Sequence, residues 1–254
     1  MNTRRQETGN DDSRKNRRLI FFFIKVFSAA EHANAFLDGQ LYCNRLSYFK
    51  DMEDQEGHTR GDVHEGVITW RQPGDVKLTL TINGTTSFDI TQLAAPFYLE
   101  ATGLNDVHVF CIYAAHSDHL VDVAKDGDDV IGGQLHVPMD LAKFGEHVVL
   151  VRAAPFIERV ASTIRANGHW ATAGLVEYYD PETFSGEFTN KEALLRKQKE
   201  FAYQSEYRFA FCTGTSGKDA TFLEVGSLHD IAWRLTGDDL RGGTTLNIRQ
   251  SANS

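Results

Sequence analysis

The stretch from Phe201 to Phe211, FAYQSEYRFAF, places an amide, a carboxylate and a guanidinium at alternate positions. In an extended strand Gln204, Glu206 and Arg208 share one face, and the aromatic residues at the odd positions share the other. The aromatic face predicts a buried core. The polar face is either solvated, with Glu206 and Arg208 forming a surface ion pair worth well under ~1 kcal/mol, or the wall of an active-site cleft. Alternation alone does not separate the two interpretations.

Other patterns in the chain carry weaker signals for chemistry. Residues 116–119, HSDH, supply two histidines but no third ligand at a recognisable spacing, so no metal site is predicted. Cys43 could act as a thiol nucleophile, yet nothing in the sequence places a histidine beside it. The glycine motifs of phosphate-binding loops, dinucleotide-binding folds and hydrolase elbows do not occur. These absences leave the polar face of residues 204–208 as the leading candidate for an active site.

The composition narrows the class of protein. With 254 residues, 41% of them hydrophobic and 24% charged, the chain can bury a sizeable core, and we expect one α+β domain over residues 18–248. The formal net charge is −9, although residues 1–18 hold six basic and three acidic residues. An acidic body argues against broad binding to duplex nucleic acid and leaves a local groove open.

Both ends of the chain are polar and lack apolar periodicity. The basic tail, residues 1–17, is predicted to be disordered, with a nucleic-acid-contacting arm as the alternative. A disordered tail is also expected over residues 249–254. The apolar run Leu19–Ile24 is shorter than the core of a secretory signal, and no run reaches the ~18 residues of a membrane helix. We therefore expect a cytoplasmic protein with no membrane partner, whose three cysteines are buried thiols.

Periodicity and turn residues predict the elements that position these groups. The first half is expected to contain a strand over residues 18–27, a helix after Ser28 that ends at Gly39, a strand and turn over 41–49, a charged loop over 50–66 and a hairpin over 76–90 turning at Asn83-Gly84. The second half predicts strands near 107–114, 133–137, 147–152 and 173–179, a polar loop over 116–129, helices over 154–168 and 190–200, and a hairpin joining 201–211 to 221–226. Short turns between strands indicate an α+β fold built on bent, mainly antiparallel sheets with a few packed helices.

The order of several motifs resembles a known group of proteins. KVFSAAEHANAFLDGQLYCNRLSYFKD is followed by RGDVHEG, FGEHVVLV, GLVEYYD and a lysine shortly before YQSEYRF. This order, from Lys25 to Gly226, is similar to a widespread family of uncharacterised bacterial and phage proteins. The element order and the late glutamate also resemble the ADP-ribosyltransferase fold, including toxins that ADP-ribosylate DNA. The resemblance implies an NAD-dependent transferase acting on nucleic acid or protein in toxin or phage-conflict biology.

The resemblance assigns chemistry to the strand predicted over residues 201–211. Cleavage of the nicotinamide glycosidic bond develops positive charge on the ribose, which a carboxylate stabilises. Glu206 matches that carboxylate. Gln204, two residues earlier, matches the position that faces the acceptor.

The resemblance also suggests residues that would hold NAD. An arginine fork commonly holds phosphate or ribose, and a tyrosine commonly stacks on nicotinamide. The candidates for these two roles are Arg45, Arg60, Arg208, Tyr42 and Tyr48. The chain departs from the usual transferase pattern on its first strand, where Lys25 is the basic residue, and it has no clear Ser-Thr-Ser segment.

Simpler alternatives remain at this stage. Arg60, Asp62 and Glu65 could be an ion pair within a solvated loop, and the two tyrosines could be core aromatics. The chain could equally be a non-catalytic binding module with residues 50–66 as its contact surface, or a hydrolase of unknown type. The catalytic interpretation predicts that Gln204, Glu206 and Arg208 face a concave pocket shared with residues 41–65.

Overall fold

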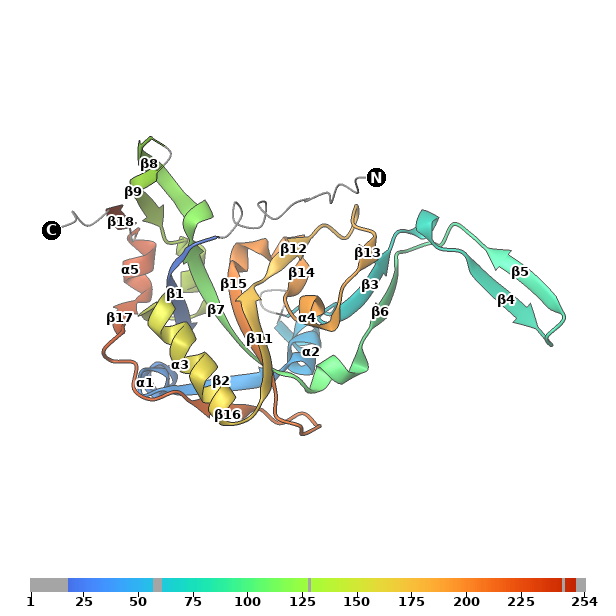
Figure 1. Ribbon diagram of the computed structural model, residues 1–254, viewed down its shortest axis with the longest axis horizontal. Coiled ribbons are helices and arrows are strands. Elements are labelled where there is room, and N and C mark those ends of the chain that lie inside the picture. Colours follow the sequence, from blue (N-terminus) through green and yellow to red (C-terminus); the bar gives the residue numbers. More distant parts are fainter. Residues whose placement is uncertain (1–17, 57–60, 128, 244, 250–254) are drawn as a thin grey trace, which may run out of the picture.

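The computed structural model describes residues 18–56, 61–127, 129–243 and 245–249, and its fold is mixed α+β (Figure 1). The tails predicted to be disordered, residues 1–17 and most of 249–254, lie outside the described residues, as does Arg60. The helices are α1 (Ala30–Leu37), α2 (Leu46–Glu56), α3 (Ala153–Ala166), α4 (Asn190–Ala193) and α5 (Gly237–Arg241). The strands are β1 (Ile20–Phe27), β2 (Gln40–Arg45), β3 (Val67–Arg71), β4 (Leu78–Ile82), β5 (Thr86–Ile90), β6 (Phe97–Glu100), β7 (His108–His116), β8 (Leu120–Asp126), β9 (Asp129–His136), β10 (His147–Arg152), β11 (Trp170–Leu175), β12 (Glu177–Tyr179), β13 (Gly186–Glu187), β14 (Arg196–Gln198), β15 (Glu206–Cys212), β16 (Thr221–Glu224), β17 (Ala232–Thr236) and β18 (Thr245–Arg249).

The largest sheet runs in the order β11-β15-β7-β1-β10-β17, with β2 and β16 added at one end of β7. Its strand pairs are antiparallel, as the sequence predicted, and the parallel pair β12–β14 stands apart from it. No two neighbouring strands on this path are consecutive along the chain, so the antiparallel pairing here does not come from short hairpin connections.

The central strand β7 is shared between two neighbours on one edge. The C-terminal end of β7 pairs with β1 from Tyr113 to His116, whereas its N-terminal end pairs with β2 at His108 and Val109. The other edge of β7 pairs with β15 from His108 to Tyr113. Between Val109 and Tyr113 the first edge of β7 therefore has no ladder partner, and the sheet splits there.

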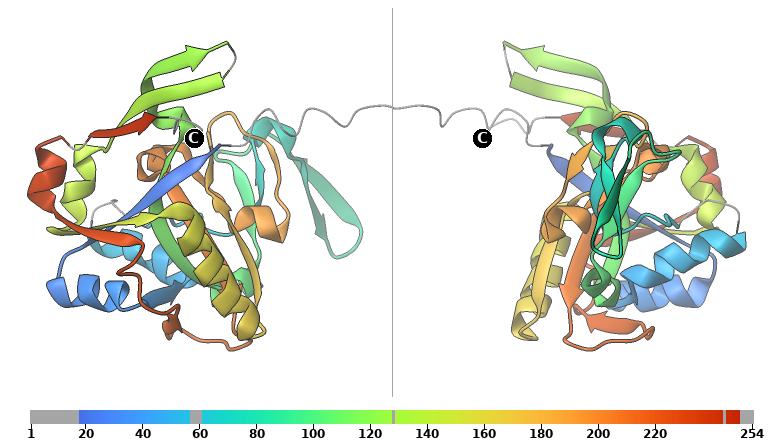
Figure 2. Two further views of the ribbon diagram at one scale, coloured as in Figure 1. Left: turned by 60° about the vertical axis from the view of Figure 1, so that its left-hand side comes forward. Right: turned by 90° about the vertical axis from the view of Figure 1, so that its right-hand side faces the viewer.

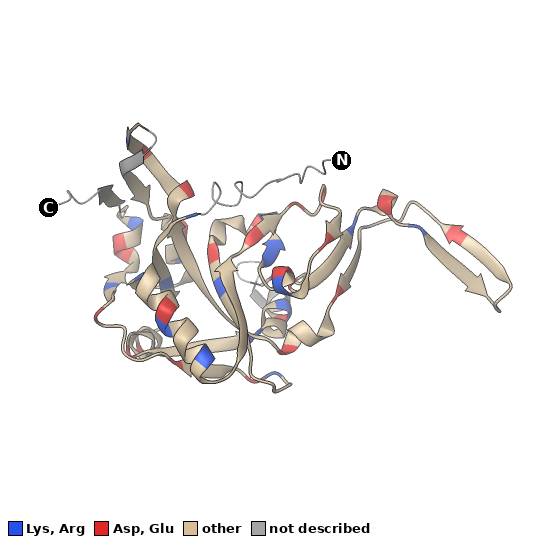
Figure 3. Ribbon diagram, viewed as in Figure 1, with Lys and Arg blue, Asp and Glu red and all other residues tan. Residues whose placement is uncertain are grey.

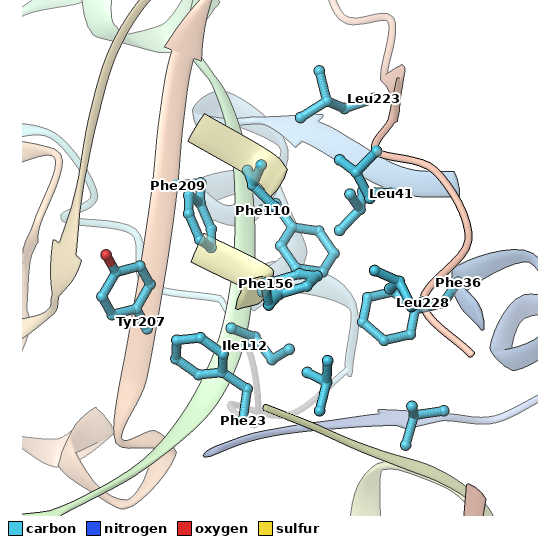
Figure 4. Packing of buried hydrophobic residues seen from close by; sticks show 14 of the residues in the cluster. Phe23, Phe36, Leu41, Phe110, Ile112, Phe156, Tyr207, Phe209, Leu223 and Leu228 are labelled. Carbon is cyan, nitrogen blue, oxygen red and sulfur yellow. The ribbon is translucent and has the colours of Figure 1, made fainter. Parts of the chain in front are cut away.

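The main core covers one face of this sheet. Aromatic side chains from four elements meet in it: Phe23 of β1, Phe36 of α1, Phe156 of α3, and Tyr207 and Phe209 of β15 (Figure 4). Helix α3 lies across this face (Figure 2), and Phe156, Val160 and Ile164, spaced at i, i+4 and i+8 along the helix, are buried. The aromatic face predicted over residues 201–211 is confirmed as core at Phe201, Tyr207, Phe209 and Phe211, but the prediction is wrong for Tyr203, which is exposed.

Several predicted boundaries are wrong. Residues 199–204 form a 3₁₀ turn and Ser205 adopts a left-handed conformation (φ 38°), so the strand begins only at Glu206. The segment predicted as a basic helix over 190–200 is helical only over α4 and then becomes strand β14. Strand β16 pairs with β2 and not with β15, so the predicted hairpin is also wrong. Each error lies where long-range pairing outweighs local propensity.

Three further predictions fail. The predicted loop over 50–66 begins as helix α2, because buried Leu46 and partly buried Phe49 pack into a small core of their own. The polar loop over 116–129 contains strand β8. Ser28 does not cap α1; Ala29 holds that position without a side-chain bond. Gly39 does end α1, since a Cβ there would lie 2.1 Å from the carbonyl oxygen of Gly226.

The hairpin predicted over residues 76–90 is confirmed. Strands β4 and β5 pair in register, and Asn83 and Gly84 adopt positive φ at the turn. In the part of the chain that the structure describes, no helix is long and apolar enough to cross a membrane.

Candidate functional site

A cavity of about 720 Å³ opens at the split in the large sheet. Its size is within the range of small-molecule sites. The described residues that line it come mainly from β1, β2, β7, α1 and α2, with single residues from β14, β15, β16 and the turn before β15. They include Lys25, His32, Gln40, Tyr42, Asn44, Tyr48, Met52, Cys111, Lys197, Gln204, Glu206 and Phe222. The structure therefore brings Tyr42, Tyr48, Gln204 and Glu206 to one cavity, whereas Arg208, predicted to face the same pocket, is not among the described lining residues.

Lys25 replaces part of the missing strand pairing at this split. Its ammonium group donates to the carbonyl oxygen of Cys111 at 2.6 Å and lies over the ring of Phe110. A buried carbonyl without a partner is costly, so a lysine at this position stabilises the open edge of β7. The same arrangement places a cation in the wall of the cavity.

Beneath the cavity lies a buried ionic quartet, which we define as Glu65, Lys197, Glu206 and Arg208. Arg208 binds Glu65 through both terminal nitrogens at 2.7 and 2.8 Å, and its Nε donates to Glu206 at 2.6 Å. Lys197 lies 3.1 Å from Glu206 and 3.3 Å from Glu65. All four side chains are at most 5% exposed. The prediction of a solvated polar face with a weak surface ion pair is therefore wrong.

The chain positions the two charges of β15 through the turn that precedes the strand. Ser205 donates to the carbonyl oxygen of Ala114, and the amide of Glu206 donates to the hydroxyl of Tyr178. Because Gln204 precedes this turn, it does not share a strand face with Glu206, contrary to prediction. Its side chain still reaches the cavity, where its amide oxygen accepts a hydrogen bond from Lys197 at 2.9 Å.

The quartet holds Glu206 in its ionised form. Burial alone would raise the pKa of this carboxyl, but the opposing charges of Arg208 and Lys197 lower the pKa well below its ordinary value. Burial likewise opposes the charge of Lys197, and Glu206 with Glu65 raises the pKa of Lys197 above its ordinary value. At neutral pH the cavity wall therefore carries a fixed carboxylate beside a fixed ammonium.

The two thiols nearest the cavity are not nucleophiles at neutral pH. Burial raises the pKa of Cys43 to about 12, and burial together with the charge of Glu206 raises the pKa of Cys111 to about 12. A nucleophilic cysteine needs its thiolate. The thiol mechanism considered for Cys43 is thereby disfavoured. Cys43 is buried as predicted, whereas Cys111 and Cys212 are partly exposed.

The arginines proposed to hold a ligand are placed differently from the prediction. Arg45 is buried outside the cavity lining and donates to the carbonyl oxygens of Asp106, Thr215 and Asp219. Arg208 is buried within the quartet, where it also donates to the carbonyl oxygen of Leu194. Neither guanidinium lines the cavity, because each is committed to groups of the protein.

The two tyrosines do line the cavity and are not core residues. Tyr42 is 56% exposed and packs against Phe222, which is 58% exposed. Tyr48 is 43% exposed and meets Phe49 edge to face. Exposed aromatic rings beside a cavity can stack on a base or another flat ring. The core-aromatic alternative is therefore wrong for both residues.

Sequence reasoning missed Lys197 and Tyr178 as parts of this site. Lys197 lies in a segment predicted to be helical, and Tyr178 supports Glu206 from a separate strand. The lysine shortly before YQSEYRF was the available signal. Lys25, noted as the basic residue of the first strand, also lines the cavity.

The HSDH segment lies at a smaller cavity of about 140 Å³, which Glu206 also borders. The rings of His116 and His119 lie 3.8 Å apart, and Ser205 is 3.4 Å from the Nε2 atom of His119. Burial lowers the pKa of His116 to about 4, so this ring is neutral at pH 7. The described residues hold no group of three or more ligands suited to a metal ion.

Asp62 lies beside the quartet, 2% exposed, and accepts bonds from the amides of His64 and Gln198. Burial, reinforced by the charge of Glu65, raises the pKa of Asp62 to about 7. Because this folded-state pKa exceeds the ordinary value of 3.8, the stabilising contribution is complete below pH 3.8 and is lost as the pH rises toward 7.

We expect Asp62→Asn to remove this pH dependence. The free energy of unfolding of the wild type, minus that of the variant, should fall by a few kcal/mol between pH 4 and pH 7.5. The pKa values of His108, His116 and His119 are lowered and give an opposite slope, but they are common to both proteins and cancel in the difference. Urea denaturation at each pH provides the measurement, and parallel stability curves would contradict the assignment.

Comparisons with protein-family models, curated proteins and solved structures gave no match to this chain. The function is therefore argued from the geometry of the cavity.

Proposed function

We propose that the chain binds NAD in the cavity at the split sheet and transfers ADP-ribose to a nucleic-acid or protein acceptor. The observation that carries this proposal is Glu206, an ionised carboxylate in the cavity wall next to Gln204. In the proposed step the nicotinamide–ribose bond breaks, and nicotinamide leaves with the bonding electrons. Glu206 stabilises the positive charge that develops on the ribose, and a nucleophile of the acceptor then forms the new bond.

The lining of the cavity supports a ligand that is both aromatic and anionic. Tyr42, Tyr48 and Phe222 offer rings for nicotinamide or adenine, and Lys25 offers positive charge for the diphosphate. The phosphate-binding role suggested earlier for an arginine is therefore assigned to Lys25 of the first strand. Strands β1 and β2, joined by α1, pair with different parts of β7 at this point.

A specific observation favours a second candidate, a binding module without catalysis. Both carboxylate oxygens of Glu206 are already engaged, one by Arg208 and the other by Lys197. A carboxylate whose charge is neutralised by two cations in this way can have a purely structural role. The two candidates differ in turnover, because a binding module would take up NAD and leave the glycosidic bond intact.

Removing an aromatic ring from the cavity tests NAD binding directly. We expect Tyr42→Ala and Phe222→Ala each to weaken NAD binding about tenfold, since stacking on a base contributes roughly 1–3 kcal/mol. Titration calorimetry gives the Kd, and nicotinamide release gives turnover. Tyr203→Ala is the matched control, because Tyr203 is 46% exposed and is not among the lining residues.

The outcomes separate the candidates. Binding with turnover supports the transferase, and binding without turnover for any acceptor supports the module. Absence of NAD binding by the wild type would refute both forms of the proposal. If the Tyr42, Phe222 and Tyr203 variants bound NAD with equal affinity, the NAD site would lie outside this cavity.

A further inference from the structure

The β4–β5 hairpin extends away from the rest of the molecule (Figures 1 and 2), and its large apolar side chains are exposed. Alternation and register place five apolar side chains on one face: Leu78, Leu80, Ile82, Phe88 and Ile90. Leu80 and Phe88 form a cross-strand pair at its centre and are 51% and 54% exposed. Among the described strands, β4 and β5 pair only with each other. A two-stranded hairpin is marginally stable in water, and an apolar face of this kind marks an interaction site.

The opposite face of the hairpin is polar and internally satisfied. Thr81 and Ser87 bond across the strands, and Asp89 accepts from Thr79 and pairs with Lys77. No charged residue occurs between Leu78 and Phe88, so the ribbon in Figure 3 carries charge colours only toward the base of the hairpin. A partner of the apolar face therefore meets no charged side chain between Leu78 and Phe88, which favours an uncharged partner surface.

We propose that the apolar face binds the same face of a second copy of this chain, giving a two-fold symmetric dimer. A two-fold interface requires a self-complementary surface, and a neutral strip two strands wide meets that requirement. Each chain carries a net charge of −9, but the hairpin projects from its body, and charges farther apart than ~8 Å are screened at physiological salt.

The polar face makes a membrane a poorer partner. Insertion of the hairpin would bury its Thr and Ser hydroxyls, and Lys77, the cation nearest the apolar face along the strand, is already paired with Asp89.

The contact area sets the strength of the proposed dimer. A five-residue strand is about 17 Å long, so two paired faces bury less than the ~800 Å² per partner of a standard interface. The dimer is accordingly weak and depends on concentration.

Light scattering of the full chain, from about 1 µM to about 500 µM, tests the proposal over the range of weak affinities. The expected mass rises from 28.5 kDa toward twice that value. The double variant Leu80→Lys with Phe88→Lys places like charges in the interface and should raise the dimer Kd roughly 100-fold or more. The matched control is Thr81→Lys with Ser87→Lys, a cross-strand pair on the opposite face that adds the same charge.

The control should dimerise like the wild type, and thermal denaturation should show that both doubles retain the fold, because the hairpin lies outside the core clusters. A monomeric wild type throughout the range would overturn the proposal. So would a dimer that survives the Leu80 and Phe88 substitutions. Co-sedimentation of a monomeric wild type with neutral phosphatidylcholine vesicles, lost in the same variant, would assign the face to a lipid surface instead.

Discussion

Glu206→Gln is expected to reduce nicotinamide release from NAD by ~10²-fold or more, because charge stabilisation of the transition state commonly contributes that much. Glutamine keeps the shape of the side chain and removes the negative charge from the cavity wall. The measurement is single-turnover release of nicotinamide by the purified full chain, with the fold checked by circular dichroism. A surviving turnover would mean that another group stabilises the ribose.

The structure requires a control for stability in this experiment. On a solvated strand face, Glu206→Gln would hardly affect folding. In the structure Glu206 compensates Arg208 and Lys197 inside the protein, and removing one partner of a buried ion pair costs about 3–5 kcal/mol.

Glu65→Gln is the matched control. Glu65 belongs to the same quartet and pairs with the same two cations, but it is not among the described residues that line the cavity. We expect a comparable loss of stability from Glu65→Gln, with turnover retained to within about tenfold. An equal loss of turnover in both variants would show that the effect of Glu206 is structural.

Arg208→Met is expected to have the largest effect on folding. The guanidinium is fully buried, and its removal leaves two carboxylates opposite the single ammonium group of Lys197. The expected cost is at least about 3–5 kcal/mol, a large part of the ~5–15 kcal/mol that stabilises a typical domain. Urea denaturation measures the loss directly, and a low soluble yield is the expected companion result.

Arg159→Met provides the comparison for Arg208. Arg159 forms a two-pronged pair with Asp230 at the surface, where the aspartate is 62% exposed. A surface pair typically contributes less than about 1 kcal/mol. If the two substitutions destabilised the protein equally, the quartet would have no special part in folding.

Local patterns were sufficient for part of the fold. The 3.6-residue stripe of Phe156, Val160 and Ile164 defined helix α3, and the Asn83-Gly84 turn defined the β4–β5 hairpin. In both elements the side-chain period and the turn residues depend on neighbours close in the chain. The partner of β16 could not be read in this way, because its pairing with β2 joins residues more than 170 positions apart.

Sequence by itself determined the composition of the candidate site: an aromatic face backed by a carboxylate and a guanidinium, with two tyrosines and a lysine earlier in the chain. Only the tertiary structure decided what each group does. Arg208 is buried between Glu65 and Glu206, whereas Tyr42 and Tyr48 are exposed and line the cavity. The cause is the split of β1 and β2 along β7, a long-range arrangement at which the cavity opens. Residue types and spacing carry no information about that split, because it depends on which strands pair.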